Sequence, residues 1–293
     1  MTHPEDSNPH PKEQPEQESG NVEAEDQNAR DISSDPGVEE NETGREKGQG
    51  NAGVESTVSP SPRQKIAAWL VHIFTATGIA VALLAFIAVS DRDWREVYLW
   101  LFVALLIDGV DGTLARKARV TEVLPQMSGK MVDSVIDFTT YAMIPAFFFY
   151  QAQLAPEGWN FLCAAVMVVS SALYYGKEGM IADSMHFIGF PALWNVFVFF
   201  DFFVFDLPGW LNAAMVFLFA ALHFAPIKFA YPSRATRWRG LTLAISIAAL
   251  IAAALLIWEY PARSPFLKII VVVAGVYFVV LAVLETYVKG LKD

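Results

Sequence analysis

Long apolar stretches separated by short polar segments occupy the chain from Lys65 onward. They run to roughly 18 to 25 residues each, and a helix needs about 20 apolar residues to cross a hydrocarbon layer about 30 Å thick. We therefore predict an all-α, polytopic membrane bundle of about eight transmembrane helices without internal repeats. The predicted spans cover residues 67–89, 94–115, 130–152, 158–175, 187–206, 209–228, 239–258 and 266–288.

The first 62 residues follow a different pattern, rich in Glu, Gln, Asn, Ser, Pro and Gly and poor in large apolar side chains. Such a segment buries too little apolar surface to offset the entropy lost on ordering. We predict a disordered acidic tail over 1–62 and a transmembrane domain over 63–293. The tail lacks the charged, apolar and small-residue succession of a secretory signal, so we expect none.

Composition and charge agree with this division. Hydrophobic residues make up 54% of the chain, against about 45 to 50% in soluble domains. The net charge of -10 arises in the tail, because residues 1–60 hold 15 acidic and 4 basic residues, which leaves 16 acidic and 17 basic residues elsewhere. We expect a lipid-bilayer environment and no nucleic-acid partner. The single cysteine, Cys163, excludes a disulfide framework and a thiolate metal site.

Lysine and arginine are distributed unevenly between the predicted loops. With the tail placed inside, thirteen of them lie on the cytoplasmic side, against Arg92, Arg95, Arg263 and Lys268 outside. Because cytoplasmic loops are enriched in these residues, we predict that both termini are cytoplasmic.

Four aspartates interrupt the apolar pattern near the cytoplasmic ends of the second and third spans. On a helix, Asp108, Asp111, Gly112 and Ala115 fall at i, i+3, i+4 and i+7 and share one face. Gly129, Asp133 and Asp137 fall at i, i+4 and i+8 on the next helix, again on one face. We therefore expect two acidic stripes to meet across one gap.

Charge repulsion limits what such a cluster can be. Carboxylates about 6 Å apart repel by about 3 kcal/mol per pair at an effective dielectric constant near 20. Protonation, as in a proton relay, would remove the repulsion, and so would two divalent cations. We favour two cations, since an all-oxygen ligand set suits Mg²⁺ or Mn²⁺.

A metal pair at the membrane boundary is suited to phosphoryl transfer, because two ions can stabilise the attacking and the leaving oxygens together. Gly112 and Ala115 leave room for a nucleotide, and Arg116, Lys117 and Arg119 supply further positive charge. The lipid setting suggests a lipid donor.

The pattern D-x-x-D-G-x-x-A-R, twelve residues, then G-x-x-x-D-x-x-x-D resembles the signature of the CDP-alcohol phosphatidyltransferases, with all eight motif positions present. The stretches 71–78, 123–129, 170–175 and 189–195 resemble the bacterial members that form phosphatidylcholine. The resemblance implies condensation of CDP-diacylglycerol with choline to give phosphatidylcholine and CMP. It also implies Mn²⁺ as the usual metal, a homodimer, and a location in the bacterial inner (cytoplasmic) membrane.

The resemblance also assigns roles to the motif residues. Asp108, Asp111 and Asp133 match the family's metal ligands, while Asp137 borders the metals and matches the general base that takes the proton from the choline hydroxyl. Gly112, Ala115 and Gly129 match positions lining the cytidine nucleotide site, and Arg116 belongs to the same substrate-binding motif.

Several residues outside the motif can be interpreted either as substrate-binding or as structural. His72 and Thr75, one turn apart on the first span, either contact the nucleotide or make interhelical hydrogen bonds. We include Thr75 among the substrate-binding residues. Tyr174, Tyr175 and Trp194 are candidates for choline, because a quaternary ammonium is held best against aromatic faces. Interface or core packing explains the same aromatic residues.

Two alternative functions remain open from the sequence. The acceptor alcohol of a phosphatidyltransferase can be serine, inositol or glycerol phosphate in place of choline. A cation-coupled transporter is the other alternative, although its site would lie near the membrane midplane within repeated halves.

Overall fold

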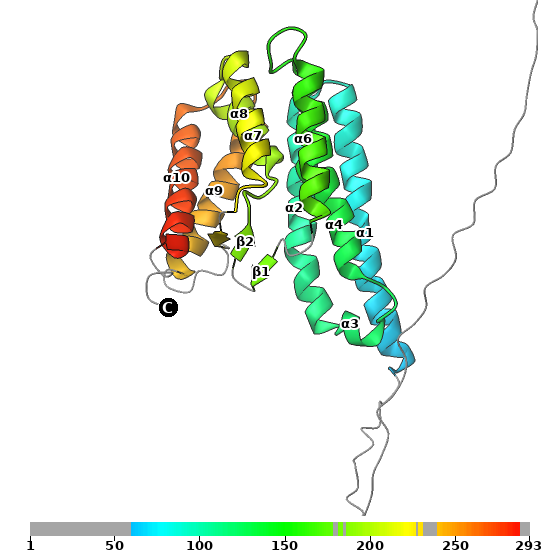
Figure 1. Cartoon of the computed structure of the whole chain (residues 1–293). Coiled ribbons are helices and arrows are strands. Elements are labelled where there is room, and N and C mark those ends of the chain that lie inside the picture. The colour runs from blue at the N-terminus through cyan, green and yellow to red at the C-terminus, as the bar shows by residue number, and fades with distance from the viewer. Residues whose placement is uncertain (1–59, 178–180, 184–185, 227, 231–238, 288–293) are drawn as a thin grey trace, which may run out of the picture. The chain divides into compact units, whose positions relative to one another are not determined.

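The structure is a computed structural model, and it describes residues 60–177, 181–183, 186–226, 228–230 and 239–287. Residues 1–59, and with them nearly all of the predicted tail, lie outside the described residues. The described part is helical except for three strands of three residues each, which confirms the predicted all-α class. Figure 1 shows the arrangement of the elements.

The first helices build one side of the bundle. Helix α1 covers Pro62–Ser90, α2 covers Trp94–Lys117, and α1 packs along α2 and against α4, Gly129–Phe138 (Figure 1). Ser61 and Gln64 form a capping box at the start of α1, which satisfies backbone donors that have no partner inside the helix. The short helix α3, Val120–Val123, joins α2 to α4.

The third predicted span is a continuous helix of three parts. Helix α4 continues as the π-helical segment η1, Thr139–Met143, and then as α5, Ile144–Gln151. Pro145 lies just after the π-helical turn and has no backbone N–H to donate into the preceding turn. Wider turns accommodate such a break in the hydrogen-bond ladder without ending the helix.

The remaining helices complete the bundle. They are α6, Asn160–Tyr175; α7, Trp194–Phe199, continued by the π-helical segment η2, Phe200–Phe205; α8, Gly209–Leu222; α9, Arg239–Glu259; and α10, Pro265–Tyr287. Helix α6 packs against α5 and α8, and α9 packs against α10 and α2 (Figure 1). Strands β1, Ile181–Asp183; β2, His186–Ile188; and β3, Lys228–Ala230, form a small antiparallel sheet in the order β1-β2-β3.

Within the described residues, five helices are long and apolar enough to cross a membrane: Pro62–Ser90, Trp94–Lys117, Gly129–Gln151, Gly240–Glu259 and Pro265–Leu284. The other three predicted spans coincide with shorter apolar helices over Asn160–Tyr175, Trp194–Phe205 and Gly209–Leu222. The protein is therefore a helical membrane protein, and the structure is consistent with about eight spans.

Two predicted boundaries, one in the fifth span and one in the sixth, lie farthest from those of the structure. The fifth span was expected from residue 187, but helix α7 begins at Trp194. Gly189 has a φ of +93°, and a Cβ there would lie 2.1 Å from the carbonyl oxygen of His223, so this backbone turn requires glycine. The sixth span was expected to reach residue 228, but α8 ends at Leu222, and Pro226 and strand β3 follow.

Aromatic side chains fill the core between the helices. Tyr98 on α2 contacts the rings of Phe148, Phe199 and Phe203 at centroid distances of 5.5, 5.7 and 5.0 Å, and its hydroxyl donates to the Asn195 carbonyl at 3.1 Å. These contacts join α2 to α5, α7 and η2, so the helix that carries half of the acidic motif is held by the centre of the bundle.

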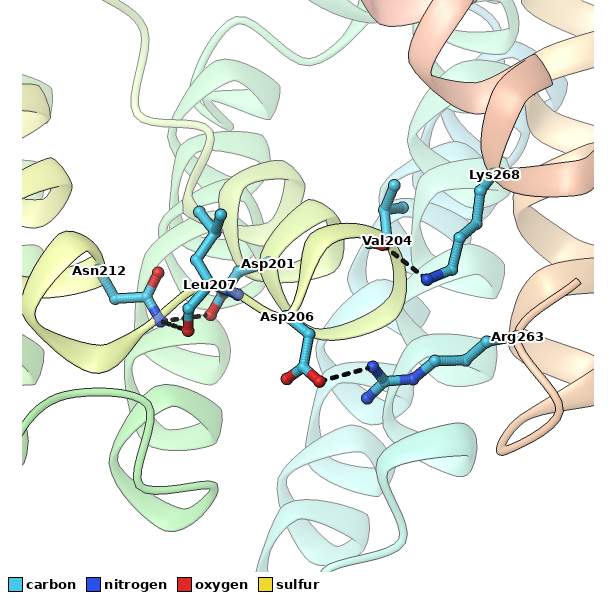
Figure 2. Close-up of polar contacts among 7 residues, drawn as sticks. All are labelled: Asp201, Val204, Asp206, Leu207, Asn212, Arg263 and Lys268. Carbon is cyan, nitrogen blue, oxygen red and sulfur yellow. Dashed lines mark hydrogen bonds and ion pairs between the residues drawn. The ribbon is translucent and has the colours of Figure 1, made fainter. Parts of the chain in front are cut away.

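The end of the bundle near η2 is held by polar contacts, shown in Figure 2. Asp201 is 1% exposed; it accepts hydrogen bonds from the Leu207 backbone N–H at 3.1 Å and from Asn212 Nδ2 at 2.9 Å. Lys268 Nζ donates to the Val204 carbonyl at 2.7 Å, and Arg263 pairs with Asp206 at 3.1 Å. These contacts connect η2 with α8, α10 and the loop before α10.

Candidate active site

Helices α2 and α4 carry the motif residues, as the sequence predicts. Asp108, Asp111, Gly112, Ala115 and Arg116 lie on the C-terminal half of α2. The chain then turns at Arg119, which has a left-handed φ of +51°. Helix α4 starts at Gly129 after the N-cap Ser128, whose side chain accepts a hydrogen bond from the Met131 N–H at 3.2 Å. This turn and cap direct α4 back along α1, so its aspartates approach those of α2.

Three of the four aspartates form one close group. Carboxylate oxygens of Asp108, Asp133 and Asp137 all lie within 4.8 Å of one another, and each of these side chains is half-buried. Asp111 is buried and is not part of this group, although it lies close enough to the other three to interact with them electrostatically. The two acidic stripes therefore meet through Asp108, Asp133 and Asp137, with Asp111 near them.

The charge of this group is not balanced by neighbouring cations of the described chain. No described lysine or arginine forms an ion pair with these aspartates. Arg116 Nη2 donates to the Thr113 hydroxyl on its own helix at 3.2 Å, and Arg119 pairs with Glu122. Half-buried carboxylates this close need a compensating positive charge or a proton. The donor set is all oxygen, so the group fits a hard divalent cation such as Mg²⁺ or Mn²⁺.

Tyr141 is a site residue that the sequence analysis missed. Its hydroxyl donates to Asp108 Oδ2 at 3.2 Å, across from η1 to α2. A signal for it was present, because Tyr141 follows Asp137 by four residues and continues the stripe of Gly129, Asp133 and Asp137. Because Tyr141 is aromatic, its residue type alone indicates packing in the core, as for the many other aromatic residues of the chain.

The positions expected to line the nucleotide site include Gly112 and Ala115 near the end of α2 and Gly129 at the start of α4. Gly129 faces His72 of α1, and a Cβ at Gly129 would lie 3.3 Å from the His72 Cε1. Ala115 packs on a small apolar cluster formed by Ala68, Val120, Val123 and Leu124. Gly112 has only the Arg116 side chain near its Cβ position, at 3.4 Å. Thr75 is buried on α1, one turn from His72.

The three choline candidates lie in different surroundings. Tyr175 is close enough to Asp137 for electrostatic interaction, and its ring meets that of Phe138 edge-on at 5.9 Å. Tyr174 is buried and packs against His223 at 5.3 Å. Trp194 is fully buried, and its Nε1 donates to the Ser171 hydroxyl at 2.8 Å. The structure therefore brings Tyr175 to the acidic group, while Tyr174 and Trp194 pack in the core behind it.

Comparisons with known proteins identify the family. No protein-family model matches the chain. The phosphatidylcholine synthase of Pseudomonas aeruginosa is 42% identical over 222 residues, which cover 76% of this chain and 93% of the relative. That of Rhizobium meliloti is 40% identical over 232 residues, covering 78% and 95%, and that of Mesorhizobium japonicum is 42% identical over 193 residues, covering 64% and 72%.

The chain belongs to the phosphatidylcholine synthase family. Membership of the phosphatidylcholine synthase family confirms the resemblance found in the motif, and with it the prediction of an enzyme of the CDP-alcohol phosphatidyltransferase type. In this family context, the group of Asp108, Asp133 and Asp137 is the natural candidate for the reaction centre.

Proposed function

We propose that the protein transfers the phosphatidyl group of CDP-diacylglycerol to choline, which yields phosphatidylcholine and CMP. The observation that carries this proposal is the grouping of Asp108, Asp133 and Asp137 within 4.8 Å, from two helices, in a chain of the phosphatidylcholine synthase family. The names of the relatives support the product, and the acids support the chemistry.

Asp108, Asp111 and Asp133 would hold Mn²⁺ or Mg²⁺, with Asp137 completing the set, and we propose two ions. When bound, the ions would neutralise charge on the pyrophosphate oxygens of the donor. Tyr141 orients the Asp108 carboxylate through its hydrogen bond. Gly112, Ala115, Arg116, Gly129 and Thr75 would bind the cytidine nucleotide of the donor.

We assign the role of general base to Asp137. It is half-buried in the group with Asp108 and Asp133, and it interacts electrostatically with Tyr175. Its carboxylate would take the hydroxyl proton of choline while the choline oxygen forms a bond to the lipid-side phosphorus. The bond from that phosphorus to the bridging pyrophosphate oxygen breaks, and CMP leaves.

Choline would lie with its ammonium group against the ring of Tyr175. Among the three candidates, Tyr175 has the support of its proximity to Asp137, because the choline hydroxyl must reach that carboxylate. A quaternary ammonium gains from an aromatic face and from nearby carboxylates together. Tyr174 and Trp194 would then support Tyr175 from the core.

We further propose an inner-membrane enzyme with both termini and the acidic group on the cytoplasmic side, as the loop charges indicate. A homodimer is proposed from the family resemblance. The acidic tail that precedes helix α1 would take no part in catalysis.

The test is an acceptor panel with the full-length protein in lipid nanodiscs. Labelled CDP-diacylglycerol and Mn²⁺ are supplied with choline, ethanolamine, serine, inositol or glycerol 3-phosphate. We expect labelled phosphatidylcholine and equimolar CMP with choline, and loss of turnover after chelation with recovery on adding Mn²⁺. A product with another alcohol, or none with any alcohol, would refute the proposal.

The variants D108N and D137N test the roles of the acids. Both should lose more than about a thousandfold in kcat while remaining inserted in the membrane, because each loses a charge that the reaction needs. D91N, at an exposed position on the other end of α1 and α2, is the matched control and should keep full activity. Near-normal kcat in D137N would remove the assignment of the base.

A further inference from the structure

A buried imidazole beside the candidate site has an unpaired nitrogen. His72, on α1, is 5% exposed, and its Nε2 has no hydrogen-bond partner among the described residues. The ring contacts Trp69 edge-on, at a centroid distance of 6.1 Å. Buried polar atoms are nearly always paired in native proteins, so an unpaired one indicates a group that is paired in another state.

The position of His72 relates it to α4. A Cβ at Gly129 would lie 3.3 Å from His72 Cε1 and 3.7 Å from its Nδ1, so the imidazole lies directly against the backbone of the first residue of α4. Nδ1 is the nearer ring nitrogen, whereas Nε2, which is bonded to the same Cε1, is not among the atoms within 4 Å of that Cβ position. One turn earlier on α1, Ala68 shares an apolar cluster with Ala115 of α2. His72 therefore lies among elements that carry the motif.

Helix geometry relates this position to the acids. Gly129 and Asp133 are four residues apart on one face of α4, which corresponds to about 6 Å along the helix axis. A nucleotide whose phosphates lie at the carboxylates would extend its ribose and base over a comparable distance. The nucleoside would then lie at the same height along α4 as Gly129 and His72. Its hydroxyl, carbonyl and amine groups are all hydrogen-bond partners for an imidazole.

We propose that His72 Nε2 forms a hydrogen bond with the nucleoside part of the cytidine nucleotide, which makes His72 a substrate-binding residue. The inference rests on the proposed function, because that function supplies a cytidine nucleotide. A side chain at Gly129 would press on this imidazole, because its Cβ would lie 3.3 Å from His72 Cε1.

The test compares the variants H72F and H72N with the unchanged protein. Phenylalanine keeps an aromatic ring at this buried position and removes the unpaired nitrogen. CMP affinity is measured by calorimetry with Mn²⁺ in nanodiscs, pyrophosphate affinity is measured in the same way, and unfolding temperature is recorded without ligand. T77A is the control, since Thr77 is exposed on α1 and its hydroxyl bonds to the Phe74 carbonyl of its own helix.

We expect H72F to weaken CMP binding about tenfold, to leave pyrophosphate binding within twofold and to leave the unfolding temperature equal or higher. H72N should lie between H72F and the unchanged protein. Unchanged CMP affinity in H72F would overturn the role of His72 and leave the proposed function standing. If H72F weakened pyrophosphate binding as much as CMP binding, the assignment to the nucleoside would be wrong. Failure of the unchanged protein to bind CMP would overturn the proposed function as well, whereas CMP binding without choline transfer would overturn only the acceptor.

Discussion

Asp108 and Tyr141 illustrate how single residues set the chemistry of the acidic group. Asp108 lies within 4.8 Å of Asp133 and Asp137, and the Tyr141 hydroxyl is the neutral donor that reaches it at 3.2 Å. A neutral donor orients a carboxylate without cancelling the charge that a cation needs. We therefore propose a positioning role for Tyr141, which lies outside the D-x-x-D-G motif.

Removing that hydroxyl should reduce activity. We expect Y141F to lower kcat/KM about tenfold, because a hydrogen bond to a charged group contributes about 1.5 to 3 kcal/mol and about 1.4 kcal/mol corresponds to a factor of ten. The concentration of Mn²⁺ for half-maximal rate should rise as well. Y150F, at an exposed position on α5, is the control. Equal Mn²⁺ dependence in Y141F and the unchanged enzyme would contradict this role.

The crossing of helices α1 and α4 positions the acids of α4. A Cβ at Gly78 would lie 3.1 Å from Cγ2 of Ile136, the residue just before Asp137. The two helices approach this closely because α1 has no side chain at the crossing. Asp137 is therefore held at its distance from Asp108 partly by a glycine on a third helix.

Substitution of this glycine should disturb the site from outside it. We expect G78A to reduce kcat several-fold, because the added methyl group must push Ile136 and α4 away, and overpacking costs about 1 to 3 kcal/mol. The double variant G78A/I136A removes the obstructing methyl group and should recover part of the lost rate. G240A is the control, because no described residue lies within 4 Å of its Cβ position. No recovery in the double variant would argue against steric displacement.

Among the described residues, charged side chains gather in two places that differ in their partners. One is formed by the four motif aspartates of α2 and α4, which pair with no described lysine or arginine. The other is the set of contacts around η2, where Asp201, Asp206, Arg263 and Lys268 all have partners (Figure 2). Satisfied polar groups hold helices together, whereas unsatisfied ones are available to ligands. The same residue types therefore stabilise the fold in one place and, in the proposed function, provide the chemistry in the other.

This difference predicts that Asp201 affects stability and leaves substrate binding unchanged. We expect D201A to lower the unfolding temperature in detergent by several degrees, because the Leu207 N–H and the Asn212 amide lose a buried acceptor, at a cost of about 1 to 3 kcal/mol. KM for choline should be unchanged. D206A removes an exposed ion pair, worth about 0 to 1 kcal/mol, and should change the unfolding temperature less. An altered KM in D201A would assign Asp201 to the site.

Much of the architecture follows from local pattern alone. The apolar stretches locate the helices because each segment must satisfy its own backbone hydrogen bonds in lipid. The spacing of Asp108, Asp111, Asp133 and Asp137 fixes which acids share a helix face. The same eight motif residues suffice to indicate the family, which the comparisons confirm.

The tertiary structure decided which residues meet. Spacing along one helix says nothing about its rotation and distance relative to another helix, and these depend on contacts such as Gly78 with Ile136. Only the packed bundle separates Asp111 from the close group, brings Tyr141 and Tyr175 to it and buries Trp194 in the core. The close approach of Gly189 to His223 likewise joins segments that are 34 residues apart, and helix α7 begins only after it, at Trp194. The sequence by itself determined the helices and their acidic faces, because these depend on periodicity; the site depends on how side chains from different helices pack, which is a property of the folded molecule.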